Sequence, residues 1–228
     1  MKLHGRLAFA AVVMVAAVGA LLFPMAPVLA DGTPARVRGS VVSLDGPKLV
    51  VHAKDGKDVS ISLADNFAAL AVVKSSMADI KQGTFIGTAT VTQPDSTLRS
   101  VEVVVFPDNL RGTAEGHYPW DLGPSSMMTN GNVAAVSAAP GASVNTAMTD
   151  GTVSASASQN GVKRLTVTYN GGQQLIVVPP TAPIVDLLPS AESDLSKGAY
   201  VFVDAAKDGR SLTAGLVAAG AGRLKPPF

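Results

Sequence analysis

The regular alternation of apolar and polar side chains is the clearest pattern along this chain. Val59, Ile61 and Leu63 alternate with Ser60 and Ser62, which is the period of a strand with one buried face. Similar short runs precede and follow this one, so the first half of the chain is predicted to be mainly β. The five predicted strands lie at residues 37–44, 49–51, 59–63, 85–91 and 98–106.

Turn residues separate these runs. Asp45-Gly46 supplies the positive φ that a tight hairpin needs, and a second Asp-Gly pair lies within residues 54–57. Residues 93–96, Gln-Pro-Asp-Ser, join the last two strands. Between the third and fourth strands, residues 65–82 carry apolar side chains at helical spacing after an Asp that can cap. We therefore expect a single helix there, which ends at Gly83.

An internal repeat divides the chain into two similar halves. Three anchor segments align at offsets of 116, 115 and 114 residues, so the deletions fall in loops. The counterpart of Gly39–Val42 in the second copy is open between residues 131–136 and 151–155. The Ala/Ser/Gly-rich residues 137–161 are accordingly a long hairpin or an insertion. The aligned anchors are Leu49–Gly56 with Leu165–Gly172, Ile80–Phe85 with Leu195–Tyr200, and Leu98 with Leu212.

Five strands with a helix or loop between the third and fourth is the order of a small OB-like barrel. The repeat therefore predicts a mainly β protein with two tandem five-stranded OB-like barrels. The predicted divisions are a first barrel over 35–110, a junction segment over 111–131, a second barrel over 132–222 and a tail over 223–228.

Each repeat runs through Gly-x-Val, a Leu-x-Val strand, a turn, a second strand and Ile/Leu-x-x-Gly-x-Phe/Tyr. This pattern resembles an exported bacterial OB-like domain of unknown function, nearly end to end. The whole arrangement is similar to a group of uncharacterised exported proteobacterial proteins, some of which carry metal-transport permease names. The chain departs from a permease, because after residue 30 no apolar run is long enough to span a bilayer. The segments that add to the likeness are Glu115–Leu122, Met128–Asn130 and Val178–Pro180.

The first thirty residues have the pattern of a signal peptide. Lys2 and Arg6 precede the apolar run Leu7–Phe23, and small residues lead to Ala30. A retained membrane anchor is the alternative, but two prolines after the run favour cleavage. We expect a mature chain that begins at Asp31, is periplasmic or secreted, and has no membrane span.

Charge and composition narrow the range of partners. The chain has 18 Lys+Arg and 17 Asp+Glu, and loss of the two leader cations leaves a net charge of about −1, which does not favour nucleic acid or an anionic membrane. Few aromatic side chains occur in the strands, which argues against a stacking platform for single strands. There is no Cys, so packing must stabilise the fold without disulfides.

Signatures of catalysis are missing from the sequence. It has no Gly-x-Ser-x-Gly, no Cys nucleophile and no phosphate-binding Gly-Lys-Ser/Thr loop. Only two His, His52 and His117, lie after the leader. A pair of carboxylates brought together by the fold stays open, because spacing does not test it. We predict a protein that is not an enzyme and has no cofactor.

The junction segment carries the candidate site residues: Glu115, His117, Tyr118, Trp120 and Asp121. Trp120 is the only Trp, and Pro119 before it favours an extended backbone. We expect Trp120 to pack against a barrel surface and Tyr118 to point the opposite way. The segment is predicted to engage an unknown protein partner or small ligand, in a non-enzymatic binding or structural module.

A metal-handling accessory protein is the alternative function. His117 with Met127 and Met128 would suit a soft ion such as Cu(I). The spacing matches no fixed set of metal ligands, however, and a Met pair serves equally well as an apolar plug. These three residues are therefore weak candidates, and no metal site is predicted.

Overall fold

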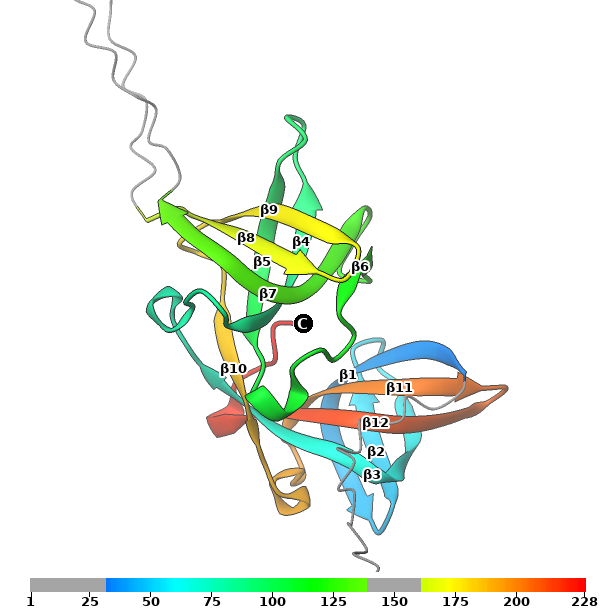
Figure 1. The fold of residues 1–228 in the computed structure, drawn as a ribbon. Helices are drawn as coiled ribbons and strands as arrows, with labels where there is room; N and C mark the ends of the chain where they lie inside the picture. Colours follow the sequence, from blue (N-terminus) through cyan, green and yellow to red (C-terminus); the bar gives the residue numbers. More distant parts are fainter. Residues whose placement is uncertain (1–31, 139–160) are drawn as a thin grey trace, which may run out of the picture.

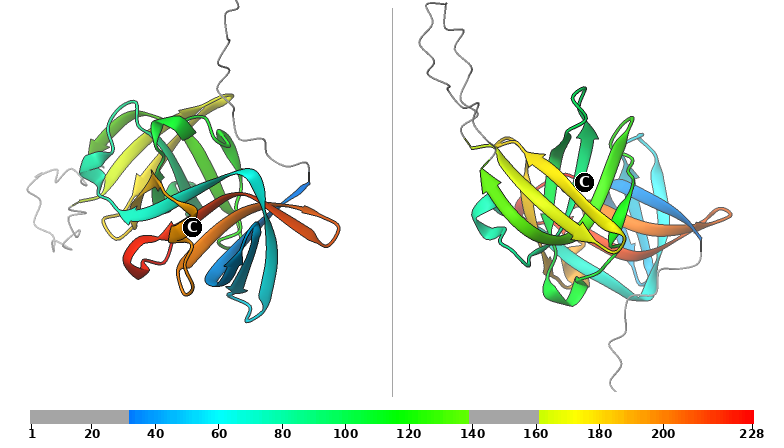
Figure 2. Two further views of the ribbon diagram at one scale, coloured as in Figure 1. Left: turned by 90° about the horizontal axis from the view of Figure 1, so that it is seen from below. Right: turned by 45° about the horizontal axis from the view of Figure 1, so that its top comes forward.

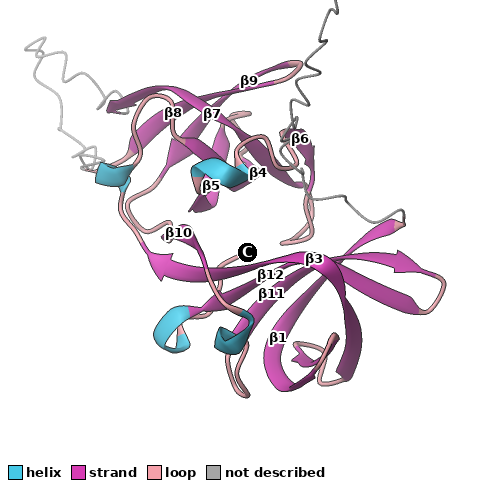
Figure 3. Ribbon diagram, turned by 60° about the horizontal axis from the view of Figure 1, so that its bottom comes forward, coloured by secondary structure: helices cyan, strands magenta, loops and turns pink. Residues whose placement is uncertain are grey.

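The structure, a computed structural model, describes residues 32–138 and 161–228. The expected signal peptide and nearly all of the uncertain insertion lie outside the described residues. Strands dominate the described chain, and its helices are single 3-10 turns (Figure 3). These turns are η1 (Met77–Asp79), η2 (Asp108–Leu110), η3 (Glu192–Asp194) and η4 (Ala221–Arg223).

Five strands close into a barrel, which forms the lower lobe in Figure 1. Their order is β1-β2-β3-β12-β11, and β11 returns to β1. Only the β3–β12 pair is parallel. Val51, Ile61 and Val203 fill the interior and are at most 1% exposed. The strands are β1 (Thr33–Asp45), β2 (Lys48–Ala53), β3 (Asp58–Lys74), β11 (Tyr200–Asp208) and β12 (Ser211–Gly220).

A second group of five strands forms the upper lobe in Figure 1. Its order is β5-β4-β7-β8-β9, and β9 pairs with β5 in parallel over two residue pairs. Ile86, Val133 and Leu165 are buried between these strands. The short strands β6 and β10 add to the edges of the lobes. The bounds are β4 (Phe85–Thr92), β5 (Leu98–Val105), β6 (Gly116–Pro119), β7 (Ser126–Ala138), β8 (Lys163–Tyr169), β9 (Gly172–Val178) and β10 (Ile184–Pro189).

Each lobe takes strands from both halves of the chain, so two tandem barrels are not confirmed. β4 and β5 follow the first three strands in sequence, but they pair with β7 and β9. β11 and β12 pair in turn with β1 and β3. The long β3 runs from one lobe towards the other (Figure 2) and pairs there with β10, with Val72 opposite Leu187.

The two halves nevertheless share the same local structure at the repeat anchors. Gly83 and Gly198 adopt φ values of 86° and 84°. The Gly83 N–H donates to the Val133 carbonyl at 2.8 Å, and the Gly198 N–H donates to the Val41 carbonyl at 2.8 Å. Each valine N–H returns a 2.9 Å bond to the residue after the glycine. The equivalent bonds thus join each half to the other half.

Two further glycines identify the repeat segment that the sequence leaves open. A Cβ atom on Gly39 would lie 2.1 Å from the His52 carbonyl oxygen, and one on Gly131 would lie 2.3 Å from that of Thr168. Both positions therefore need glycine because a neighbouring strand occupies the space of a side chain. Residues 131–136 are accordingly the counterpart of the segment at Gly39.

The helix expected over residues 65–82 is wrong, because most of that range is strand. β3 continues to Lys74, since Leu70 and Val72 alternate into the core between the lobes. The strands β12 and β10 pair with both edges of this stretch, and that pairing outweighs the helical spacing. Only η1 is helical, and the Asp79 carboxylate caps it by accepting from the Ser76 N–H.

Replacement of Gly39 by Ala tests the close strand contact. The new methyl group must displace the His52 carbonyl, so we expect Gly39→Ala to lower the free energy of unfolding by about 1–3 kcal/mol. Chemical denaturation measures the change. Gly215→Ala is the matched control, because a Cβ there meets no atom within 4 Å. Equal stability of the two variants would contradict the strand pairing described.

Candidate ligand-binding cavity

A cavity of about 400 Å³ lies between the two lobes. Its walls come from both lobes, from the segment around β6 and from the tail. A larger hollow of about 680 Å³ lies beside η3 and η4. No described residue lining that hollow has a buried side-chain polar atom without a partner, so the cavity between the lobes is the better candidate. Its large apolar side chains are Phe106, Leu110, Tyr118, Trp120, Met128, Leu187, Phe202, Leu216 and Phe228.

Aromatic rings form a connected wall of this cavity. The ring centroids of Trp120 and Phe202 are 6.3 Å apart, and those of Phe202 and Phe228 are 5.0 Å apart. Tyr118 meets Trp120 edge to face at 6.2 Å. The expected tail thus inserts a ring that is 5% exposed. Tyr118 and Trp120 lie on the same side, contrary to expectation, because residues two apart in an extended segment share a face.

The β1–β11 pair presents charged side chains to this region. Val37 and Val203 face the barrel interior, so the alternating positions Arg36 and Asp204 face outward as a cross-strand pair. The Arg36 guanidinium carbon lies 3.8 Å from the centre of the Trp120 ring. This is a cation–π contact, which holds the tryptophan between the lobes.

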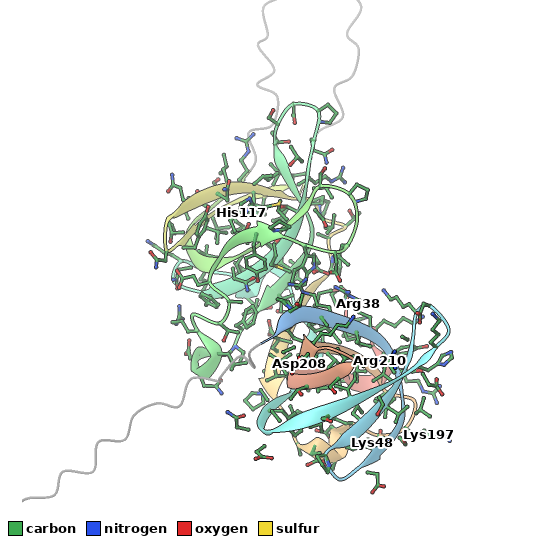
Figure 4. All side chains as sticks on the ribbon, turned by 90° about the vertical axis from the view of Figure 1, so that its right-hand side faces the viewer. Arg38, Lys48, His117, Lys197, Asp208 and Arg210 are labelled. Atoms are coloured by element: carbon green, nitrogen blue, oxygen red, sulfur yellow. The ribbon has the colours of Figure 1, made fainter. Side chains whose placement is uncertain are left out.

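An ion pair joins the junction segment to the barrel. Arg38 donates two hydrogen bonds to the Asp121 carboxylate, at 2.8 and 2.7 Å. Burial alone would raise the pKa of Asp121, but the bonds and charge of Arg38 outweigh it and lower that pKa. Figure 4 shows Arg38 on the side of its lobe that faces the other lobe. The pair therefore ties the loop after β6 to β1.

Asn130 is a fixed polar group on the cavity wall. It is 5% exposed, and its Nδ2 donates to the Thr113 carbonyl and to the Tyr118 hydroxyl, each at 3.2 Å. Its Oδ1 has no partner among the described residues. Gly87 on β4 lies opposite, and a Cβ there would be 2.6 Å from Oδ1. The glycine therefore makes room for this amide.

Other groups in this layer also have unused hydrogen-bonding capacity. Trp120 Nε1 and Arg36 Nε are buried without a partner among the described residues. Asp204 has no hydrogen bond or ion pair in that part of the chain, and burial raises its pKa against the attraction of Arg36. Burial likewise raises the pKa of Tyr118 to about 12. Unpaired polar groups are uncommon in native interiors, so their gathering here calls for an explanation.

Glu102 is the most buried acid of the described chain. It is 1% exposed, and neither carboxylate oxygen has a partner. Val104, two residues further on β5, lines the cavity, so Glu102 lies on the same side. Burial raises the pKa of Glu102 to about 8, against the opposing attraction of Arg38 and with a further rise from Asp121. The carboxyl is therefore mainly protonated at pH 7.

The structure separates Met128 from the other two expected metal candidates, His117 and Met127. His117 pairs with Thr129 across β6 and β7, while Tyr118 pairs with Met128, so His117 and Met128 lie on opposite faces. His117 Nδ1 is 2.8 Å from the Thr129 hydroxyl, and burial lowers the pKa of this histidine. Its ring stacks on that of Tyr169, and Figure 4 shows His117 in the upper lobe.

The remaining candidates have separate positions. Met128 lines the cavity, whereas Met127 pairs with Pro119 and lies on the same face as His117, outside the cavity. The Glu115 carboxylate accepts from the Asn170 N–H at 2.9 Å. No group of three or more His, Cys, Asp or Glu that could hold a metal occurs in the described residues. Of the candidate residues in and beside the junction segment, Tyr118, Trp120 and Met128 thus line one cavity. The remaining candidates lie outside it.

Sequence reasoning missed several residues of this layer. Glu102 interrupts the run of valines from 101 to 105, and an acid within such a run is the signal that could have identified it. Arg36 and Arg38 alternate with Val37 in a similar way. No local sequence pattern indicates that Phe202 belongs to this layer, because the register of β1 with β11 decides its position.

Comparisons with known proteins identify no relative of this chain. No family model, curated protein or solved structure matches the chain. Within residues 32–138 and 161–228, no helix is long and apolar enough to cross a membrane.

Glu102→Gln tests the buried neutral acid. The stability from this carboxyl is fully present below its ordinary pKa of 4.5 and is lost as pH rises through about 8, because the unfolded chain ionises first. We expect variant and wild type to agree near pH 4.5. The variant should become more stable by pH 8, on the order of a few kcal/mol. Denaturation at both pH values measures this, and parallel pH profiles would contradict it.

Proposed function

We propose that this protein is an exported, non-enzymatic binding module that holds a small, mainly apolar ligand in the cavity between its lobes. The aromatic wall of the cavity is the observation that carries the proposal. A cavity of about 400 Å³ is within the usual size range of small-molecule sites. Such sites are mostly apolar with a few placed polar groups, and this cavity has the same composition. The leader pattern supports export.

We propose further that both lobes are OB-like barrels whose last two strands are exchanged between the repeats. In the first lobe, three consecutive strands are followed by β12 and β11. In the second lobe, β7, β8 and β9 are followed by β5 and β4. Both orders agree with an OB-like barrel, and the matching bonds of Gly83 and Gly198 support the equivalence of the repeats.

A dye-binding experiment tests the ligand cavity. N-phenyl-1-naphthylamine fluoresces strongly in apolar surroundings, and we expect it to bind the mature chain and quench Trp120. Ala68→Phe should weaken binding at least tenfold, because Ala68 lines the cavity and the larger ring fills it. Fluorescence titration measures both effects.

Ala71→Phe is the matched control. Ala71 lies three residues further on β3, on the opposite face, and does not line the cavity. Its affinity should stay within twofold of the wild type, and both variants should retain the native circular dichroism spectrum. Equal loss in both variants, or no loss in either, would contradict the proposed site.

The metal-handling alternative predicts that a soft metal ion stays bound to the protein, whereas the apolar-ligand proposal predicts that none does. Because Met128 lies on the opposite face of the β6–β7 pair from His117 and Met127, the three candidates cannot bind one ion together. We therefore expect no stoichiometric Cu(I) or Zn(II) to remain after dialysis against a weak chelator. Elemental analysis of the mature protein measures retention. One equivalent of copper that His117→Ala abolishes would favour the alternative over the apolar ligand.

A further inference from the structure

The polar groups of the cavity wall indicate which chemical class of ligand fits. We infer that the ligand is an uncharged molecule with an apolar body and a hydroxyl or amide group, whose hydrogen Asn130 or Asp204 accepts. This inference rests on the proposed function and adds the recognition of the polar end. The aromatic rings would hold any apolar body, so the polar atoms must supply the selectivity.

Asn130 supplies a fixed acceptor. Its two Nδ2 bonds, to the Thr113 carbonyl and the Tyr118 hydroxyl, define which end of the amide is oxygen. The reverse orientation would place oxygen against the Thr113 carbonyl, which cannot donate. The free Oδ1 therefore faces away from these partners. A buried acceptor of this kind is complementary to a donor on a ligand.

Asp204 supplies a second acceptor on the opposite lobe. It lines the cavity, and its carboxylate has no hydrogen bond to another described residue. Trp120 Nε1 adds an unpaired donor to the same layer. A hydroxyl or an amide both donates and accepts, so either group satisfies a wall that offers both kinds of atom.

The balance of charge favours an uncharged ligand. Arg36 and Arg38 are offset by Asp121 and Asp204, while the buried Glu102 carboxyl is mainly protonated at pH 7. A cationic ligand would meet Arg36, whose guanidinium already stacks on Trp120. An anionic ligand would meet Asp204. Arg36 and Asp204 lie opposite each other across β1 and β11 and already offset one another, so a charged ligand would leave one net charge in a largely buried space, which is unfavourable.

Four probes with one shared ring system test this inference on the mature chain at pH 7. They are naphthalene, 2-naphthol, 2-naphthoate and 2-naphthylmethylammonium, measured by fluorescence titration. We expect 2-naphthol to bind at least tenfold more tightly than naphthalene and than either ion. Asp204→Asn, which keeps the shape of the side chain, should reduce the preference for 2-naphthol severalfold and leave naphthalene binding unchanged. Asp208→Asn, at the exposed end of the same strand, is the control (Figure 4).

The outcomes separate this inference from the proposed function. Equal binding of naphthalene and 2-naphthol would overturn the donor requirement but leave the apolar cavity in place. If either ion bound more tightly than 2-naphthol, the inference that the ligand is uncharged would be wrong. A preference that Asp204→Asn and Asp208→Asn change equally would overturn the role of Asp204. Failure of all four probes, together with failure of the dye, would overturn the proposed function itself.

Discussion

Each three-stranded unit of this chain has two sheet edges that only the other half of the chain closes. The N–H and carbonyl groups of such edges need partners once they are buried. β11 and β12 supply them to β1 and β3, while β4 and β5 supply them to β7 and β9. Neither lobe is therefore complete without the other half, and we expect the two lobes to fold together.

The space between the lobes lies where the two halves of the chain meet. β3 and β10 cross there as an antiparallel pair, and the chain passes through the same region again at the junction segment and the tail. Trp120, Phe202 and Phe228 come from distant parts of the sequence and meet at this crossing. The Arg38–Asp121 pair holds the junction loop against the barrel, so the cavity wall has support from both sides.

Polar groups buried in this layer lower stability unless they find partners. Glu102, Asn130 and Asp204 all lie there, and the interiors of the two lobes contain the apolar side chains that stabilise the fold. Functional sites often retain such unfavourable groups because their free capacity serves recognition. Glu102 differs from the other two, because its protonated form tolerates burial and it does not line the cavity. Asn130 and Asp204 line the cavity and can contact a ligand.

Local pattern predicted the strands of the first half and the Asp45-Gly46 hairpin, because these depend on neighbours in the sequence. The sequence also singled out Trp120, because it is the only Trp of the chain. The tertiary structure alone decided which half completes each lobe and that β3 replaces the expected helix. The physical reason is that the two copies share turns and register, as Gly83 and Gly198 demonstrate. Equivalent strands from either copy fit the same edge, so only the assembled fold selects the partner and places Phe202 and Asp204 beside Trp120.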